Sequence, residues 1–237
     1  MKNHILVAVI LTAASGSAQA QGFGFSGGEI SAEALTYGGG GGDFGRTAYS
    51  GALEFGITRT ISIAVDLGFY GLQTLDLQAD TATIHGIYQM SEAVSLGAFY
   101  GQDTLGGEDA QLFGIEGGTE IGAAAVEGYF AKLDGSADNA TLLGVSGTFG
   151  FTDNIAALGS FNIADLGDSS SNRLAIGGQY TIASGPDLWA EIGTFKVNDG
   201  TSTSDDTFVS IGARIEFGAA RGTTFGRRSL FETATGF

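Results

Sequence analysis

Cysteine is absent from this chain of 237 residues, and basic side chains are scarce. The lack of cysteine excludes disulfides, thiol chemistry and thiolate metal sites. Lysine and arginine together number 10 against 26 acidic residues, so the formal net charge is −16. A chain this acidic does not bind by neutralising phosphates, which excludes nucleic acid as a partner.

Proline is almost absent as well, with Pro186 alone beside 41 glycines. Disordered glycine-rich chains usually contain proline and few aromatic residues, whereas this chain has 17 Phe and 7 Tyr. The composition therefore predicts a folded protein that is rich in strands.

The chain has no long apolar run after Ala20, so no membrane-spanning helix is predicted. A transmembrane β-barrel is compatible with this absence. Its strands need only about 9 to 11 residues and carry their lipid-facing side chains at alternate positions.

The first twenty residues have the pattern of a secretory signal peptide. Lys2 provides a positive start, residues 5–11 are continuously apolar, and Ser17-Ala18-Gln19-Ala20 ends in the small-residue spacing that signal peptidases cut. We expect residues 1–20 to direct export through the Sec pathway and the mature chain to begin at Gln21.

Apolar and polar residues alternate on both sides of Thr58-Arg59-Thr60, within the stretch EFGITRTISIAVDLGFYG at 54–71. Alternation around a short polar joint predicts two strands and a tight turn. Comparable joints lie near 91 and 153, and weaker ones near 118 and 184. Their spacing of roughly 30 residues fits two strands, one short turn and one longer loop.

This repeated pattern predicts twelve strands, with ten or fourteen as alternatives. The predicted strands are 25–37, 46–57, 61–70, 81–90, 93–101, 110–117, 121–133, 140–151, 155–163, 173–182, 187–197 and 207–217. Polar, acidic segments form the longer connections at 38–43, 72–80, 102–109, 134–139, 164–172 and 198–206. Short turns alternating with longer loops are typical of outer-membrane barrels.

Alternation alone does not distinguish such a barrel from a secreted β-sandwich, which stays an alternative. Charges are nearly absent from the apolar parity at mid-strand, apart from Lys132 and Lys196 close to the loops. Aromatic residues of that parity cluster at both strand ends, like the girdles of a membrane barrel. They are Tyr49, Phe69, Tyr100 and Phe161 near the loops, and Phe55, Tyr88, Phe151, Tyr180 and Phe217 near the turns. We therefore predict an all-β, transmembrane, antiparallel up-and-down barrel.

With its signal-like start, short-turn hairpins at 57–61 and 151–155, acidic glycine-rich loops, late strand 208–217 and terminal Phe237, the chain resembles a small bacterial outer-membrane porin. The resemblance implies a location in the Gram-negative outer membrane. It also implies contact with outer-membrane lipid and lipopolysaccharide, insertion by the barrel assembly machinery, and passage of small solutes or ions. In such proteins the last strand usually ends the chain, whereas here about twenty residues follow Phe217.

We expect residues 21–218 to form the barrel and residues 219–237 to form a basic tail in the periplasm. Two other hypotheses stay open: the tail folds back toward the acidic lumen mouth and restricts it, or 229–237 extends the barrel. Ser229-Leu230-Phe231-Glu232 has the spacing of a helix capping box, which favours a tail outside the sheet. The charged residues of the tail are Arg221, Arg227, Arg228 and Glu232.

Parity also predicts which ionisable side chains line the lumen. Facing acidic and basic side chains set a transverse field that selects ions; in a barrel of this size they can equally form a salt-bridged plug. We predict a passive diffusion channel for small hydrophilic solutes or ions, with mild cation preference from the excess of acids. The alternative is a non-conducting structural or adhesive barrel with acidic, cation-binding loops. The predicted lining residues are Arg46, Glu54, Asp66, His85, Glu127, Arg173, Glu191, Arg214 and Glu216.

Other candidate sites favour simpler interpretations. His85 has no distinctive serine motif to pair with, so neither an enzyme nor a cofactor is expected. Residues 37–43 match one GGxGxD repeat, but calcium coils need tandem copies. Loop acids are weak candidates for hard-oxygen cation ligands and are more simply solvated: Asp199, Asp205 and Asp206, with Asp165 and Asp168 on another loop.

Overall fold

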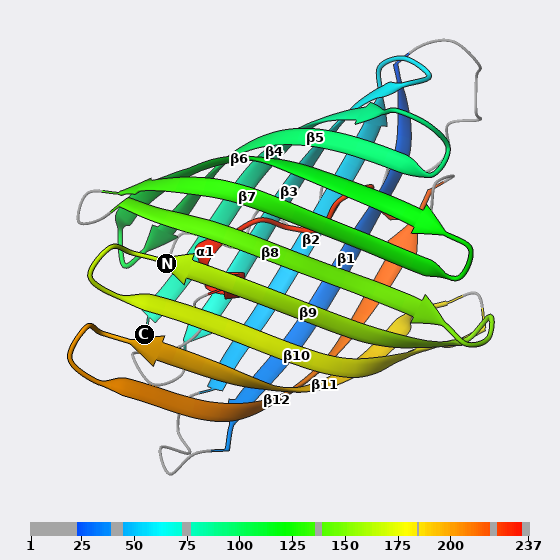
Figure 1. Cartoon of the computed structure of the whole chain (residues 1–237). Coiled ribbons are helices and arrows are strands. Elements are labelled where there is room, and N and C mark those ends of the chain that lie inside the picture. Colours follow the sequence, from blue (N-terminus) through cyan, green and yellow to red (C-terminus); the bar gives the residue numbers. More distant parts are fainter. Residues whose placement is uncertain are drawn as a thin grey trace, which may run out of the picture.

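The computed structural model describes residues 23–38, 45–72, 77–135, 139–183, 185–218 and 222–233. Within these ranges the chain forms a closed barrel of twelve antiparallel strands and one short helix (Figure 1). The strands are β1 (Gly24–Tyr37), β2 (Gly45–Gly56), β3 (Ile61–Leu72), β4 (Leu77–Gln89), β5 (Val94–Leu105), β6 (Glu108–Ile121), β7 (Ala124–Gly135), β8 (Asn139–Gly150), β9 (Ile155–Asp165), β10 (Ser170–Thr181), β11 (Asp187–Asn198) and β12 (Thr203–Phe217).

Each strand pairs with its neighbours in sequence, and β1 pairs with β12 to close the sheet. In that closing ladder Ile30 lies opposite Ile215. Closure leaves no unpaired sheet edge. The predicted all-β up-and-down barrel of twelve strands is confirmed.

The short turns use the same local chemistry more than once. Ile57 N–H donates to the Ile61 carbonyl at 2.8 Å, and Thr58 Oγ1 accepts from the Ile61 amide at 3.0 Å. Phe151, Thr152 and Ile155 repeat these bonds in the β8–β9 turn. A threonine hydroxyl that bonds a nearby amide therefore stabilises both turns.

Two predicted connections are wrong. The joint predicted at 117–120 lies inside β6, which continues to Ile121 before a turn at Gly122, where φ is +63°. Gly118 has a packing role within β6. A Cβ at this position would lie 3.2 Å from the ring of Phe225, so the glycine leaves room for that ring. The loop predicted at 102–109 is mostly strand, and Gly106 and Gly107, both with positive φ, form a two-residue turn.

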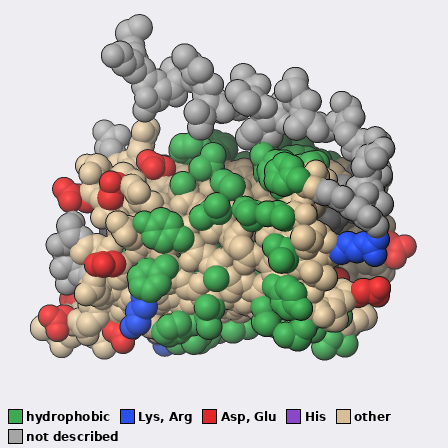
Figure 2. Space-filling model, turned by 90° about the horizontal axis from the view of Figure 1, so that it is seen from above, with side chains coloured by type: hydrophobic (Ala, Val, Ile, Leu, Met, Phe, Trp, Pro, Cys, Tyr) green, Lys and Arg blue, Asp and Glu red, His purple; other side chains and the backbone are tan. Residues whose placement is uncertain are grey.

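The apolar parity of the strands faces outward. In β3, for example, Ile61, Val65 and Phe69 are exposed, whereas Ala64 and Asp66 are buried. Figure 2 shows hydrophobic side chains spread over the wall and acidic ones gathered toward its two ends. An apolar wall around a polar interior is the arrangement that the alternation predicts.

Residues 222–233 lie inside the ring of strands, and their last four, Leu230–Thr233, form helix α1 (Figure 1). Ser229 Oγ accepts from the Phe231 amide at 3.1 Å, as an N-cap does. None of the described residues belongs to a helix long and apolar enough to cross a membrane.

The interpretation of the tail as a segment outside the barrel is wrong for residues 222–233. Phe225 and Phe231 are buried in the interior, and Arg228 is 4% exposed between strand carboxylates. Apolar burial and charge pairing therefore hold the segment within the lumen. The predicted signal peptide 1–20, the glycine run at 39–43, and Arg221 lie outside the described residues.

Candidate functional site

The predicted lining residues all project to the interior side of their strands. Arg46, Glu54, Asp66, His85 and Arg173 are buried. Four others are half-buried, and they are Glu127, Glu191, Arg214 and Glu216. Residues 222–233, here called the luminal segment, cover the predicted residues of β2–β7. Arg173, Glu191 and Arg214 lie on the opposite wall, and Glu216 of that wall lies beside Gly222.

Carboxylates of the barrel hold the backbone of the luminal segment. Thr224 N–H donates to Glu54 Oε2 at 2.7 Å, and Gly226 N–H donates to Glu127 Oε2 at 3.1 Å. Farther along, Leu230 N–H donates to Asp103 Oδ2 at 2.7 Å. These three hydrogen bonds hold the segment at three points along its length.

Two phenylalanines of the luminal segment fill apolar pockets of the inner wall. Phe225 packs with Ala64 and Ile87. Phe231 packs with Ala48, Tyr70 and Ala79, and its ring centroid lies 5.3 Å from that of Tyr70. Burying two aromatic rings stabilises this position by several kcal/mol, at about 25 cal/mol per Å² of apolar surface.

Arg228 joins a chain of buried charges. Its Nε donates to Glu116 Oε2 at 2.9 Å and its Nη2 to Glu127 Oε2 at 3.2 Å, and its guanidinium lies 4.7 Å from the Tyr129 ring centroid. Glu116 also contacts His85 Nδ1 at 2.7 Å, and His85 Nε2 lies 2.9 Å from Asp66. An imidazolium donates from both nitrogens, so this position suits the protonated ring.

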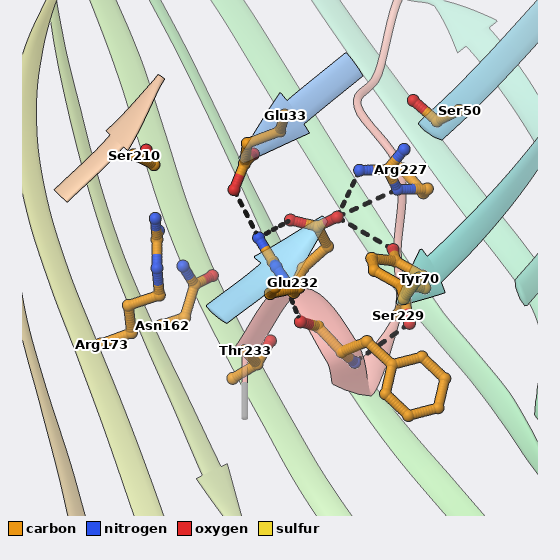
Figure 3. A network of polar contacts seen from close by, with 12 residues as sticks. Glu33, Ser50, Tyr70, Asn162, Arg173, Ser210, Arg227, Ser229, Glu232 and Thr233 are labelled. Atoms are coloured by element: carbon orange, nitrogen blue, oxygen red, sulfur yellow. Dashed lines mark hydrogen bonds and ion pairs between the residues drawn. The ribbon is translucent and has the colours of Figure 1, made fainter. Parts of the chain in front are cut away.

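A second network surrounds Glu232 (Figure 3). Its carboxylate accepts from the Arg227 guanidinium and from Tyr70 Oη, the latter at 2.9 Å. Arg46 lies 3.9 Å from Glu232, donates to Glu33 at 2.7 Å and donates to the Phe231 carbonyl. The helix end is thus tied to β1, β2 and β3 together.

The opposite wall, formed by β8–β12, carries its own ion pairs. Arg173 contacts Glu191 at 3.3 Å, and Arg214 contacts Asp187 at 3.2 Å and Glu216 at 3.1 Å. The side chains of Arg214 and Glu216 are 31% and 29% exposed. Arg173, Glu191 and Asp187 are more buried, so the exposed charge of this wall lies on β12.

The sequence pattern did not identify several acids that the structure places in the interior, namely Glu33, Asp103, Glu116, Asp187 and Glu232. Asp103 fell within a predicted loop, and Glu116 beside a predicted joint. Continuing the alternation of β5 from Phe99 through Gly101 to Asp103 would have placed that carboxylate inside.

In the described parts of the chain, the residues considered as metal ligands or catalytic groups do not come together as a site. These residues contain no cluster of three His, Cys, Asp or Glu side chains that could hold an ion. Hydrogen bonds from Ser202 and Thr201 occupy the Asp199 carboxylate and hold its pKa well below the usual range. Asp205 pairs in register with Lys196. His85 is hydrogen-bonded to two carboxylates and not to a hydroxyl nucleophile.

Comparison with known proteins finds likeness at the level of structure. No family model matches the chain, and no curated sequence matches it. A KdgM porin in complex with disordered oligogalacturonate is 7% identical, with 79% of this chain and 98% of that chain covered and a TM-score of 0.61. The COG4313 outer membrane channel from Pseudomonas putida F1 is 13% identical (85% and 97% covered, TM-score 0.58), and the NanC porin is 7% identical (78% and 98% covered, TM-score 0.57). The chain has the fold of these small porin-like channels.

Proposed function

We propose that this protein is an outer-membrane, porin-like channel through which small hydrophilic solutes or ions diffuse passively. The observation that carries the proposal is the closed barrel with an apolar wall and an interior lined by ion pairs, of which the Arg214–Glu216 pair of β12 stays partly exposed. The porin-like fold of the structural neighbours supports it.

A membrane location follows from the outer wall. Large apolar side chains are exposed around the barrel, among them Ile30, Ile84, Ile115, Ile176 and Ile211. A continuous apolar wall is unfavourable in water, and a closed sheet satisfies its backbone groups within lipid. Export by the predicted signal peptide, insertion by the barrel assembly machinery, and contact with lipopolysaccharide belong to this proposal.

The permeation path runs along the β8–β12 wall. Arg173 pairs with Glu191 there, and Arg214 pairs with Asp187 and Glu216. Side chains of opposite charge along a lumen favour hydrated, polar solutes. Acids outnumber arginines on this wall, and Glu29 of β1 adds another half-buried acid. This excess supports a mild cation preference. The path needs no catalytic residue or cofactor.

The second candidate is a structural barrel without significant conductance. The luminal segment favours this alternative, since it fills the β2–β7 side with buried ion pairs. A lumen closed by such a segment transmits little until the segment moves.

Two measurements on one purified sample test the proposal. Heat-modifiable gel migration reports the barrel, and planar-bilayer recordings under a salt gradient report conductance and selectivity. We expect a folded band of altered mobility, discrete conductance steps, and a reversal potential of cationic sign. A heat-modifiable protein without conductance would favour the structural alternative, and an anionic reversal potential would contradict the cation preference.

A further inference from the structure

The luminal segment meets the inner wall as a peptide ligand meets a receptor. It adds no strand to the sheet, although its residues follow β12 in the chain. Its hydrogen bonds and ion pairs are made with side chains of β2 to β7, whereas Leu230 packs against apolar residues that include Leu142 of β8 and Ala164 of β9.

The inner wall bonds both the amides and the carbonyls of the segment's backbone. Glu54, Glu127 and Asp103 accept from amides of the segment, as described above. Thr83 Oγ1 donates to the Arg228 carbonyl at 3.1 Å, and Arg46 donates to the Phe231 carbonyl. Such contacts are available to any chain that follows the same backbone path, so they supply affinity that is independent of side-chain identity.

Side-chain recognition has a period of three residues. Phe225, Arg228 and Phe231 each enter a separate position: an apolar pocket, a pair of carboxylates, and a second apolar pocket. The wall is shaped for the first ring, because a Cβ on Gly97 would lie 2.8 Å from it. This spacing gives the site a sequence requirement.

Charge complementarity sets the class of ligand. Arg228 and Glu116 are 4% and 0% exposed, and each has partners in several directions. Truncating one member of such a buried pair leaves an unpaired charge, so a neutral residue at this position is strongly disfavoured.

We propose that the inner wall of β2–β7 is a binding site for cationic peptides of the pattern Phe-x-x-Arg-x-x-Phe. The chain's own residues 222–233 occupy it as an exchangeable ligand. The control of conductance by this exchange rests on the proposed channel function, whereas the binding itself does not.

Covalent attachment helps to keep the site filled by the chain's own segment. A segment joined by a few residues to β12 experiences an effective concentration on the order of millimolar. A free peptide must compete with that concentration, so exchange becomes measurable once the attachment is cut.

The test uses the full chain with a protease recognition sequence in place of residues 219–221. The protein folds with its segment bound, is cut, and is washed. Labelled peptide 222–237 is then titrated onto the barrel, with fluorescence anisotropy for binding and bilayer recordings for conductance. We expect conductance to rise after washing and to fall when the peptide returns.

Matched variants separate recognition from general attraction between charges. The Arg228→Ala peptide should bind at least tenfold more weakly, and a scrambled peptide of the same composition should show no saturable binding. In the barrel, Glu116→Gln should weaken binding by a similar factor. Glu191→Gln on the opposite wall should leave it unchanged.

An uncut variant provides the binding test if the cut barrel loses its heat-modifiable fold. The uncut chain with Phe225→Ala holds its own segment less tightly, so labelled wild-type peptide should bind it at least tenfold more tightly than it binds the unaltered chain. Equal binding to both chains, or equal binding of scrambled and native peptides, overturns the proposal. Specific binding without conductance in any state refutes the channel function and supports the peptide site.

Discussion

The β2–β7 wall and the β8–β12 wall of the barrel are built from the same residue types in different environments. Arg228 and Glu116 on the first side are 4% and 0% exposed, and each contacts more than one partner. Arg214 and Glu216 on the second side are 31% and 29% exposed. Burial makes each charge depend on its partners, whereas water substitutes for lost partners on the exposed wall. We therefore expect the first wall to act mainly on stability, and the partly exposed Arg214–Glu216 pair of the second wall to act mainly on solutes in the proposed channel.

Arg228→Ala should give the largest effect. It leaves Glu116 and Glu127 without their shared cation, and we expect the free energy of unfolding to fall by about 3 to 5 kcal/mol. Urea unfolding in detergent or lipid measures this loss. Arg214→Ala is the matched control on the exposed wall, and equal losses for both variants would contradict the division between the walls.

Gly97→Ala should give the next largest effect, because its new Cβ would lie 2.8 Å from both the Phe225 ring and the Glu116 side chain. Overpacking of this kind costs about 1 to 3 kcal/mol. Gly159→Ala, whose Cβ would meet no heavy atom nearer than 4.0 Å, is the control. Thermal unfolding followed by gel mobility compares the two, and an unaffected Gly97 variant would show that Phe225 is free to move aside.

Arg214→Ala should act on selectivity more than on stability. Partly exposed ion pairs contribute about 1 kcal/mol or less, so the fold should persist. Removing a cation from the β8–β12 wall should shift the reversal potential toward stronger cation preference. Arg59→Ala, in an exposed turn between β2 and β3, should leave the potential unchanged. No shift for Arg214→Ala would mean that ions do not pass along this wall.

Lowering the pH should have the smallest effect at Asp199, which lies in the β11–β12 loop outside the barrel interior. Hydrogen bonds from its own loop depress the pKa of the Asp199 carboxyl in the folded protein. The stabilisation that these bonds give is therefore present above the pKa of an unfolded aspartate, about 3.9, and is lost only as the pH falls through the lower folded value. The amide shift of Ser202 should therefore stay constant as the pH falls through 4. A titration midpoint near the ordinary aspartate value would show that these bonds are absent.

The barrel itself could be predicted from local pattern. Strand alternation has a period of two residues, so a stretch such as 61–70 identifies its outward and inward faces without knowledge of its partners. The turns at 57–60 and 151–154 were recognisable because a threonine hydroxyl accepts from a nearby backbone amide in each. Glycine misled the prediction at 117–118, since a residue without a side chain favours a turn and a close-packed strand equally.

The sequence by itself determined the strands, their two faces and the polarity of the interior, because these follow from contacts between residues close along the chain. Only the tertiary structure decided that residues 222–233 lie within the lumen. Arg228 and Glu116 are separated by 112 positions, and their pairing depends on where the closed barrel places both. No periodicity encodes such a contact, since it arises from the burial of complementary charge and shape after the strands have assembled.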